Sequence, residues 1–116
     1  MSVARQVVFR PEAEDEVLEA REWYEARRSG LGKEFAQAVD ETVSRIIEHP
    51  LAYQRAHKET RRAVLSRFPF AVYYRIAGEE VVVQAVHGRQ DPSRWRSRSK
   101  FNSEESIKLR GKHHVV

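Results

Sequence analysis

Residues 70–76 (FAVYYRI) and 80–87 (EVVVQAVH) are two runs of strand-forming residues separated by a short turn. Both runs are rich in β-branched and aromatic side chains, and the Ala-Gly-Glu sequence between them is typical of a turn. Together they predict an antiparallel β-hairpin. Side chains alternate along a strand, which divides the first run between two faces. One face contains Phe70, Val72, Tyr74 and Ile76, and the other contains Ala71, Tyr73 and Arg75. We expect the first face to pack against helices and the second to meet a partner.

Two helices are predicted on the N-terminal side of this hairpin. The first begins at Pro11, because proline suits the first helical turn and several carboxylates follow it at the positive end of the helix dipole. Residues 29–32 (SGLG) form an interhelical turn, and a second helix continues to His49, since Pro50 disfavours helix in the residue before it. The first helix has an apolar stripe of Ala13, Val17, Ala20 and Tyr24, widened by Leu18 and Trp23. The second has Phe35, Ala38, Val39, Thr42, Val43, Ile46 and Ile47.

The remaining segments complete an α+β chain of the order β-α-α-β-β-β. Residues 3–9 (VARQVVF) and 62–66 (RAVLS) are predicted strands, and residues 51–60 are predicted to be a loop. A short helical turn is expected from Asp91 and Pro92. Three more aromatic residues are expected at the edge of the core: Trp23, Phe68 and Trp95.

The length and composition limit what the chain can be. Its 116 residues suffice for one domain, which we assign to residues 1–98, followed by a polar tail at 99–116. No apolar run is long enough to span a bilayer, so we expect a soluble, cytoplasmic protein with no membrane partner. The chain has no cysteine, which excludes disulfides and zinc–thiolate sites. Because no spaced set of ligands stands out either, we expect no metal and no cofactor.

The charge is unevenly distributed along the chain. The net charge is +4, but residues 11–30 contain seven acidic and three basic residues, whereas residues 61–100 contain nine basic and three acidic ones. Basic charge concentrated in one part of a fold is typical of a surface that meets an anionic partner, such as a nucleic acid or an acidic protein. The alternative is an arginine-rich face that contacts only solvent.

Several segments resemble the RelE/ParE superfamily of toxins. In the first half these are residues 9–14 (FRPEAE) and 20–24 (AREWY). In the second half the resemblance is stronger, in residues 61–65 (RRAVL), 67–75 (RFPFAVYYR) and 85–92 (AVHGRQDP). The resemblance implies a twisted, mainly antiparallel sheet with the αα-hairpin packed on one face. It also implies a toxin of a type II toxin–antitoxin system, bound in a hetero-oligomer by an antitoxin encoded in the same operon.

The superfamily contains two kinds of toxin, and the resemblance leaves both open. RelE-like members are ribosome-dependent mRNA endoribonucleases, whereas ParE-like members inhibit DNA gyrase. RNA cleavage without a metal needs a base, an acid and cations around the reacting phosphate. Histidine exchanges protons near neutral pH, so one hypothesis is a nucleolytic site of His87, Arg62, Arg67 and Arg89. A lone histidine at a strand end is more often a hydrogen-bonded structural residue.

We favour the ParE-like branch. The HGRQDP sequence resembles that branch, and the lysine cluster of the RelE-like ribonucleases is missing from the predicted strands. On this interpretation the target-binding residues are Arg67, Tyr73, Arg75 and Arg89, and the target is DNA gyrase rather than the ribosome and mRNA. A third alternative is a domain without toxicity that serves only as an antitoxin-binding module.

Overall fold

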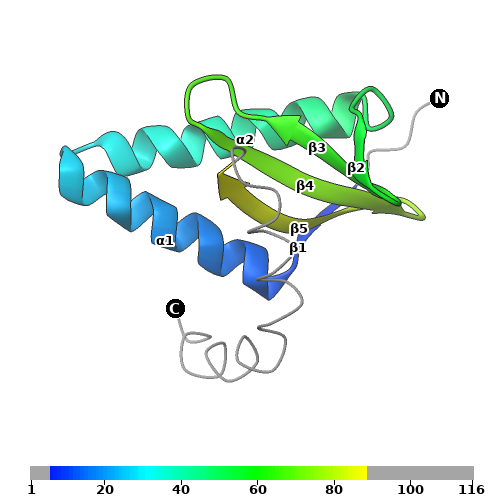
Figure 1. Cartoon of the computed structure of the whole chain (residues 1–116), viewed down its shortest axis with the longest axis horizontal. Helices are drawn as coiled ribbons and strands as arrows, with labels where there is room; N and C mark the ends of the chain where they lie inside the picture. The colour runs from blue at the N-terminus through cyan, green and yellow to red at the C-terminus, as the bar shows by residue number, and fades with distance from the viewer. Residues whose placement is uncertain (1–5, 89–116) are drawn as a thin grey trace.

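The computed structural model describes residues 6–88, which form two helices and a five-stranded sheet (Figure 1). The elements follow in the order β1 (Gln6–Phe9), α1 (Pro11–Arg27), α2 (Leu31–Glu48), β2 (Arg55–His57), β3 (Thr60–Val64), β4 (Phe70–Ala77) and β5 (Glu80–Gly88). This is the α+β class expected from the sequence, with one strand more than expected. No helix among the described residues is both long and apolar enough to cross a bilayer.

The sheet has the strand order β1-β5-β4-β3-β2. β1 runs parallel to β5, and all other neighbours are antiparallel. The predicted hairpin is confirmed as β4 and β5, in which Ala77 pairs with Glu80 across a two-residue turn. Gly78 takes the first turn position with φ 63°, where two-residue hairpins with a type II′ turn require glycine.

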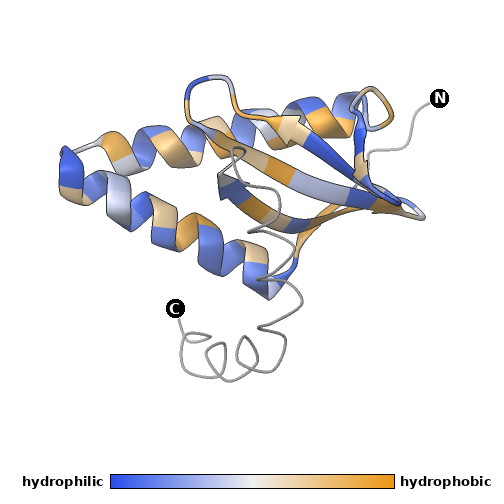
Figure 2. Ribbon diagram, viewed as in Figure 1, coloured by the Kyte–Doolittle hydropathy of each residue, from blue (hydrophilic) through white to orange (hydrophobic). Residues whose placement is uncertain are grey.

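The two faces of the sheet are those predicted by the alternation in β4. Val72 and Tyr74 are fully buried in the main core together with residues of both helices, and Phe70 and Ile76 pack against it. Ala71 and Tyr73 belong to a separate small cluster on the other face. Both helices therefore cover the same face, and Figure 2 shows hydrophobic segments along the strands that they cover.

The core depends on α2 more than on α1. Every predicted apolar position of α2 is buried or packed against the core, and α2 ends at Glu48 before Pro50, as expected. In α1 the prediction is wrong for two residues, because Leu18 and Trp23 are 38% and 53% exposed. The sequence favoured a wide stripe there, but the buried face of α1 is narrow: it consists of Ala13, Glu16 and Ala20, with Val17 and Tyr24 packed against the core. Phe68 is buried as predicted.

Three other predictions need correction or fall outside residues 6–88. Residues 51–60, predicted to be a loop, include the short strand β2, which pairs with β3. All three residues of β2 are exposed, so the sequence there lacks the alternation of apolar and polar residues that marks a strand. α2 begins at Leu31 rather than after residue 32. Some predicted features lie outside the described residues. These are residues 3–5 of the opening strand, the turn at Asp91 and Pro92, Trp95 and the tail at 99–116.

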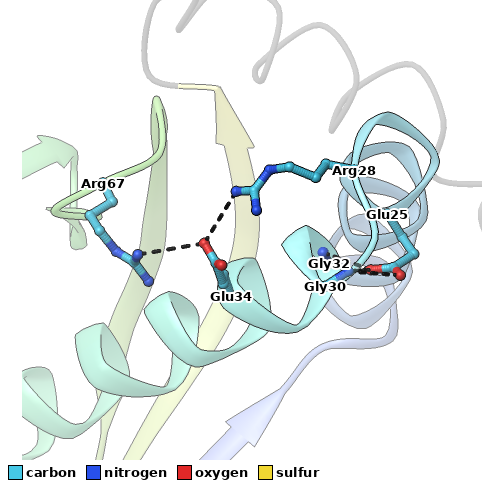
Figure 3. Close-up of polar contacts among 6 residues, drawn as sticks. All are labelled: Glu25, Arg28, Gly30, Gly32, Glu34 and Arg67. Carbon is cyan, nitrogen blue, oxygen red and sulfur yellow. Dashed lines mark hydrogen bonds and ion pairs between the residues drawn. The ribbon is translucent and has the colours of Figure 1, made fainter.

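The turn between the helices brings their backbones unusually close together. Gly30 precedes α2 with φ 90°, a left-handed conformation that favours glycine. Gly32 has a different role, since a Cβ atom there would lie 2.7 Å from the carbonyl oxygen of Arg21 in α1. The carboxylate of Glu25 accepts hydrogen bonds from the N–H groups of Gly30 and Gly32 (Figure 3). These bonds lower the pKa of Glu25 and satisfy amides that the first turn of α2 would leave without partners.

Gly32→Ala tests this close approach. Alanine gains up to about 1 kcal/mol in helix propensity, but its Cβ meets backbone that cannot rotate away. We expect a net loss of about 1 to 3 kcal/mol in the free energy of unfolding, measured by urea denaturation. Gly30→Ala is the control, because a Cβ at Gly30 has no atom within 4 Å and its cost is limited to the backbone conformation. An unchanged midpoint for Gly32→Ala would show that the two helices do not need this contact.

Candidate functional site

The face of the sheet that points away from the helices brings together four of the six residues singled out from the sequence. Residues directly opposite each other in an antiparallel pair point to the same face. Arg62 of β3 pairs with Tyr73 of β4, and His87 of β5 pairs with Ala71 of β4. Arg75 follows Tyr73 by two residues and shares its face. We call Arg62, Tyr73, Arg75 and His87 the far-face group.

The members of this group differ in accessibility. Arg62 and Arg75 are partly exposed, and they are diagonal neighbours on adjacent strands, within reach of one ligand. Tyr73 is only 1% exposed, although we expected it on a surface that meets a partner. Its ring lies 6.3 Å from the ring of His87. The sequence assigned Tyr73 to the correct face, but alternation alone cannot predict how deeply a residue is buried on that face.

A bulge in β5 shapes the same face. Tyr73 pairs with Ala85 and Tyr74 pairs with Val83, so Gln84 is an extra residue in β5. The side chain of Gln84 accepts a hydrogen bond of 2.7 Å from the buried hydroxyl of Thr60 in β3. This bond joins β3 to β5 across the strand between them, β4.

His87 is bound by a carboxylate that the sequence did not single out. Its Nε2 atom lies 3.0 Å from Oε2 of Glu16 in α1, and both side chains are nearly buried, with 11% and 7% of their surface exposed. The other oxygen of Glu16 accepts a hydrogen bond of 2.8 Å from the backbone N–H of Val86. Glu16 therefore joins α1 to the C-terminal end of β5 through both a side chain and the backbone.

The location of Glu16 follows from the shortness of β1. The parallel pairing of β1 with β5 ends where Phe9 meets Val83, and Arg10 donates one more bond to the carbonyl of Val83. Beyond this point no strand within residues 6–88 pairs with this edge of β5, and the Glu16 carboxylate accepts a backbone N–H there, as a neighbouring strand would. The signal in the sequence is the spacing of Ala13, Glu16 and Ala20, which puts a carboxylate on the buried stripe of α1. The sequence pattern places Glu16 only among the carboxylates of the first turns, near the positive end of the helix dipole.

This geometry limits the chemistry of His87. An imidazole oriented by a carboxylate is the arrangement found in many acid–base sites, but such a base must also reach its substrate. Here Nε2 faces Glu16, and the side chain has little accessible surface. Lys33 and Lys58 are the lysines among residues 6–88, and neither is on the far face. In the same residues, no group of three His, Asp or Glu side chains is placed to hold a metal ion.

Arg67 and Arg89 are not part of the far-face group. Arg67 lies in the loop between β3 and β4, where its guanidinium is 3.7 Å from a carboxylate oxygen of Glu34 in α2. Arg28 approaches the same oxygen at 3.8 Å, so Glu34 lies between two arginines at the end of the helical hairpin (Figure 3). Arg89, which we included in both the catalytic and the target-binding sets, lies outside the described residues.

Comparison with known proteins identifies similar molecules. The model of the family "ParE toxin of type II toxin-antitoxin system, parDE" matches residues 7–92. A chain of the chromosomal ParDE toxin–antitoxin system from P. aeruginosa is similar, with a TM-score of 0.67 and 16% identity over 75% of this chain and 98% of that one. A chain of the toxin–antitoxin complex RelBE2 from Mycobacterium tuberculosis is also similar, with a TM-score of 0.54 and 19% identity over 75% of this chain and all of that one. Among curated protein sequences, none matches.

Glu16→Ala tests whether the buried carboxylate is structural. The substitution removes the acceptor of a buried backbone N–H and the partner of His87, so we expect the free energy of unfolding to fall by about 3 kcal/mol. Glu16→Gln keeps an acceptor for the N–H of Val86 and should cost less. Glu22→Ala, at an exposed position of the same helix, should change stability by no more than about 0.5 kcal/mol. Thermal or urea denaturation measures all three, and equal effects of Glu16→Ala and Glu22→Ala would contradict the assignment.

Proposed function

Because the chain belongs to the ParE toxin family of type II toxin–antitoxin systems, we propose that it acts by inhibiting DNA gyrase. The observation that supports this target is the set of side chains on the far face. It has arginines that can bind an anionic or polar partner surface, but its one acid–base residue, His87, is bound to a buried carboxylate. Binding to a target requires no proton transfer, whereas RNA cleavage does. A toxin that works by binding is consistent with this arrangement.

Arg62 and Arg75 are the residues through which we propose contact with the target. Both are partly exposed, both lie on the far face, and no ion pair within residues 6–88 includes either of them. Arginine is enriched among the residues that contribute most to protein interfaces, because its planar group makes several directed hydrogen bonds. Arg67 would be less available, since it already contacts Glu34.

The test is a gyrase assay with purified protein, ATP and plasmid DNA. We expect loss of supercoiling or linear DNA trapped on the enzyme, and we expect Arg62→Ala and Arg75→Ala each to weaken this effect about tenfold or more. Lys33→Ala removes the same charge from an exposed position of α2 and should have no effect. No effect of active protein on gyrase, together with cleavage of ribosome-bound mRNA that Glu16→Gln abolishes, would support the ribonuclease alternative instead. Harmless overexpression without an antitoxin would support a non-toxic binding module.

We also propose that an antitoxin encoded beside this gene binds the exposed apolar residues of α1. The two similar structures come from toxin–antitoxin systems or complexes, which supports such a partner. Trp23 is 53% exposed, and the guanidinium of Arg27 lies 3.9 Å from the centre of its ring. An exposed tryptophan beside an arginine is the composition of an interface hot spot. Leu18 adds a second exposed apolar residue on the same helix.

Trp23→Ala tests this surface. We expect the affinity for the copurified antitoxin to fall by about thirtyfold, because truncating a hot-spot residue typically costs about 2 kcal/mol. Stability should change little, since the side chain is half exposed in the free chain. Leu51→Ala is a matched control at an apolar residue that is 69% exposed and lies far from α1 in the sequence. Titration calorimetry measures both affinities, and an unchanged affinity for Trp23→Ala would exclude this part of α1 from the interface.

A further inference from the structure

The strand pair of β2 and β3, with the turn between them, contains most of the net charge of the chain. Residues 55–62 include four basic residues and one acidic residue, Glu59, which gives a net charge of +3 out of +4 for the whole sequence. The basic residues are Arg55, Lys58, Arg61 and Arg62. We call this segment the basic ribbon. It forms the edge of the sheet opposite β1, and all three residues of β2 are exposed.

The basic ribbon has an arrangement of charge that is unfavourable for the isolated protein. Arg55 and Arg61 are directly opposite each other on adjacent strands, and like charges in this position repel. No ion pair within residues 6–88 includes a basic residue of the ribbon. β3 is hydrophilic where it lies beside β2 (Figure 2). The repulsion is therefore not relieved by a carboxylate of the described chain.

Backbone strain occurs at the tip of the same ribbon. Among the described residues, Lys58 is the one non-glycine residue with a positive φ, at 52°. Glycine or asparagine would occupy this conformation more easily, yet the turn presents an exposed lysine. Strained backbone concentrates at functional sites, where the residue is needed for more than the fold. The strained residue Lys58 and the like-charged pair Arg55 and Arg61 therefore all lie within the eight residues of the ribbon.

Other contacts hold the ribbon in a defined position. The guanidinium of Arg61 donates a hydrogen bond of 2.6 Å to the carbonyl oxygen of Tyr53, and the hydroxyl of Tyr74 donates one of the same length to Pro50. Burial raises the pKa of Tyr74 to about 12, so this hydroxyl remains a donor throughout the physiological range. Arg61 is thus a positioning residue that fixes the loop before β2, while Arg55, Lys58 and Arg62 remain available to a ligand.

We propose that the basic ribbon binds the phosphate backbone of duplex DNA. β3 is paired with β4, so the ribbon is open at its β2 edge, and it is this edge that would enter the DNA. The major groove of B-form DNA is about 12 Å wide and admits two paired strands, so the cations of the edge can lie between the two phosphate strands. The major groove of A-form RNA is too deep and narrow for this. The inference goes beyond the proposed function, which requires contact with gyrase but not with DNA. Such binding would bring the chain to the DNA on which gyrase acts.

The test is binding of the full chain to a short fluorescent DNA duplex, followed by anisotropy without gyrase. With three phosphate contacts, affinity should fall about fortyfold between about 50 and 200 mM salt. Lys58→Gln should reduce the slope of log affinity against log salt by about 1, whereas Lys33→Gln, an exposed lysine on α2, should leave it unchanged. Equal effects of these two substitutions would overturn the proposal, as would an RNA duplex that binds as tightly as DNA.

Arg55→Glu separates binding from folding. It replaces a like-charge pair with an attractive one, so we expect the Tm to rise by about 2 to 4 °C while DNA affinity falls at least tenfold. A loss of binding in a more stable protein cannot result from misfolding. Unchanged DNA affinity in this variant would overturn the proposal. So would binding of a polyglutamate peptide, but not of DNA, that Arg55→Glu abolishes, because it would assign the ribbon to an acidic protein. Arg62 belongs both to the ribbon and to the proposed gyrase contact, so Arg75→Ala, which lies outside the ribbon, distinguishes failure of the gyrase proposal from failure of this one.

Discussion

The buried carboxylate of Glu16 accepts the N–H of Val86 and contacts His87, and through these bonds it fixes α1 to the end of the sheet that β1 does not reach. A backbone N–H at an edge without water or a partner costs free energy, and a buried carboxylate without partners costs more. The Glu16 carboxylate provides the acceptor that the Val86 N–H needs, and this N–H provides a donor to the buried carboxylate. Because α1 is tied to β5 in this way, α2 can pack across the same face, and its aromatic residue Phe35 can meet Phe68 from the loop between β3 and β4 and Phe70 from β4.

This arrangement separates the molecule into surfaces of different chemistry. The core face is closed by α1 and α2, so the partner contacts that we propose lie on the outer side of α1, on the far face and on the sheet edge formed by β2. α1 is mainly acidic and presents exposed Trp23 with the Arg27 guanidinium over its ring, whereas β2, β3 and β4 present Arg55, Arg61, Arg62 and Arg75. With surfaces of different charge, the proposed antitoxin and the proposed target can contact separate parts of one small domain.

The fold by itself does not distinguish the two branches of the superfamily. Chains from a ParDE system and from a RelBE2 complex both resemble this structure at less than 20% identity, and one scaffold can support unrelated functions. What differs between such toxins is the chemistry on the exposed strands. In this chain the far face has arginines and a histidine held by Glu16, and these residues, rather than the topology, support the proposed target.

The sequence by itself determined the order of the elements other than β2, the β4–β5 hairpin, the buried stripe of α2 and the face on which each residue of β4 lies. These depend on local periodicity, which a single chain segment contains in full. Only the tertiary structure decided that Trp23 is exposed, that β2 pairs with β3 and that Arg67 faces Glu34 instead of joining Arg62 and Arg75. It also decided that Glu16 meets His87, 71 positions later in the sequence. Such contacts join segments far apart in the chain, and they arise from the packing of whole elements, which no local pattern encodes.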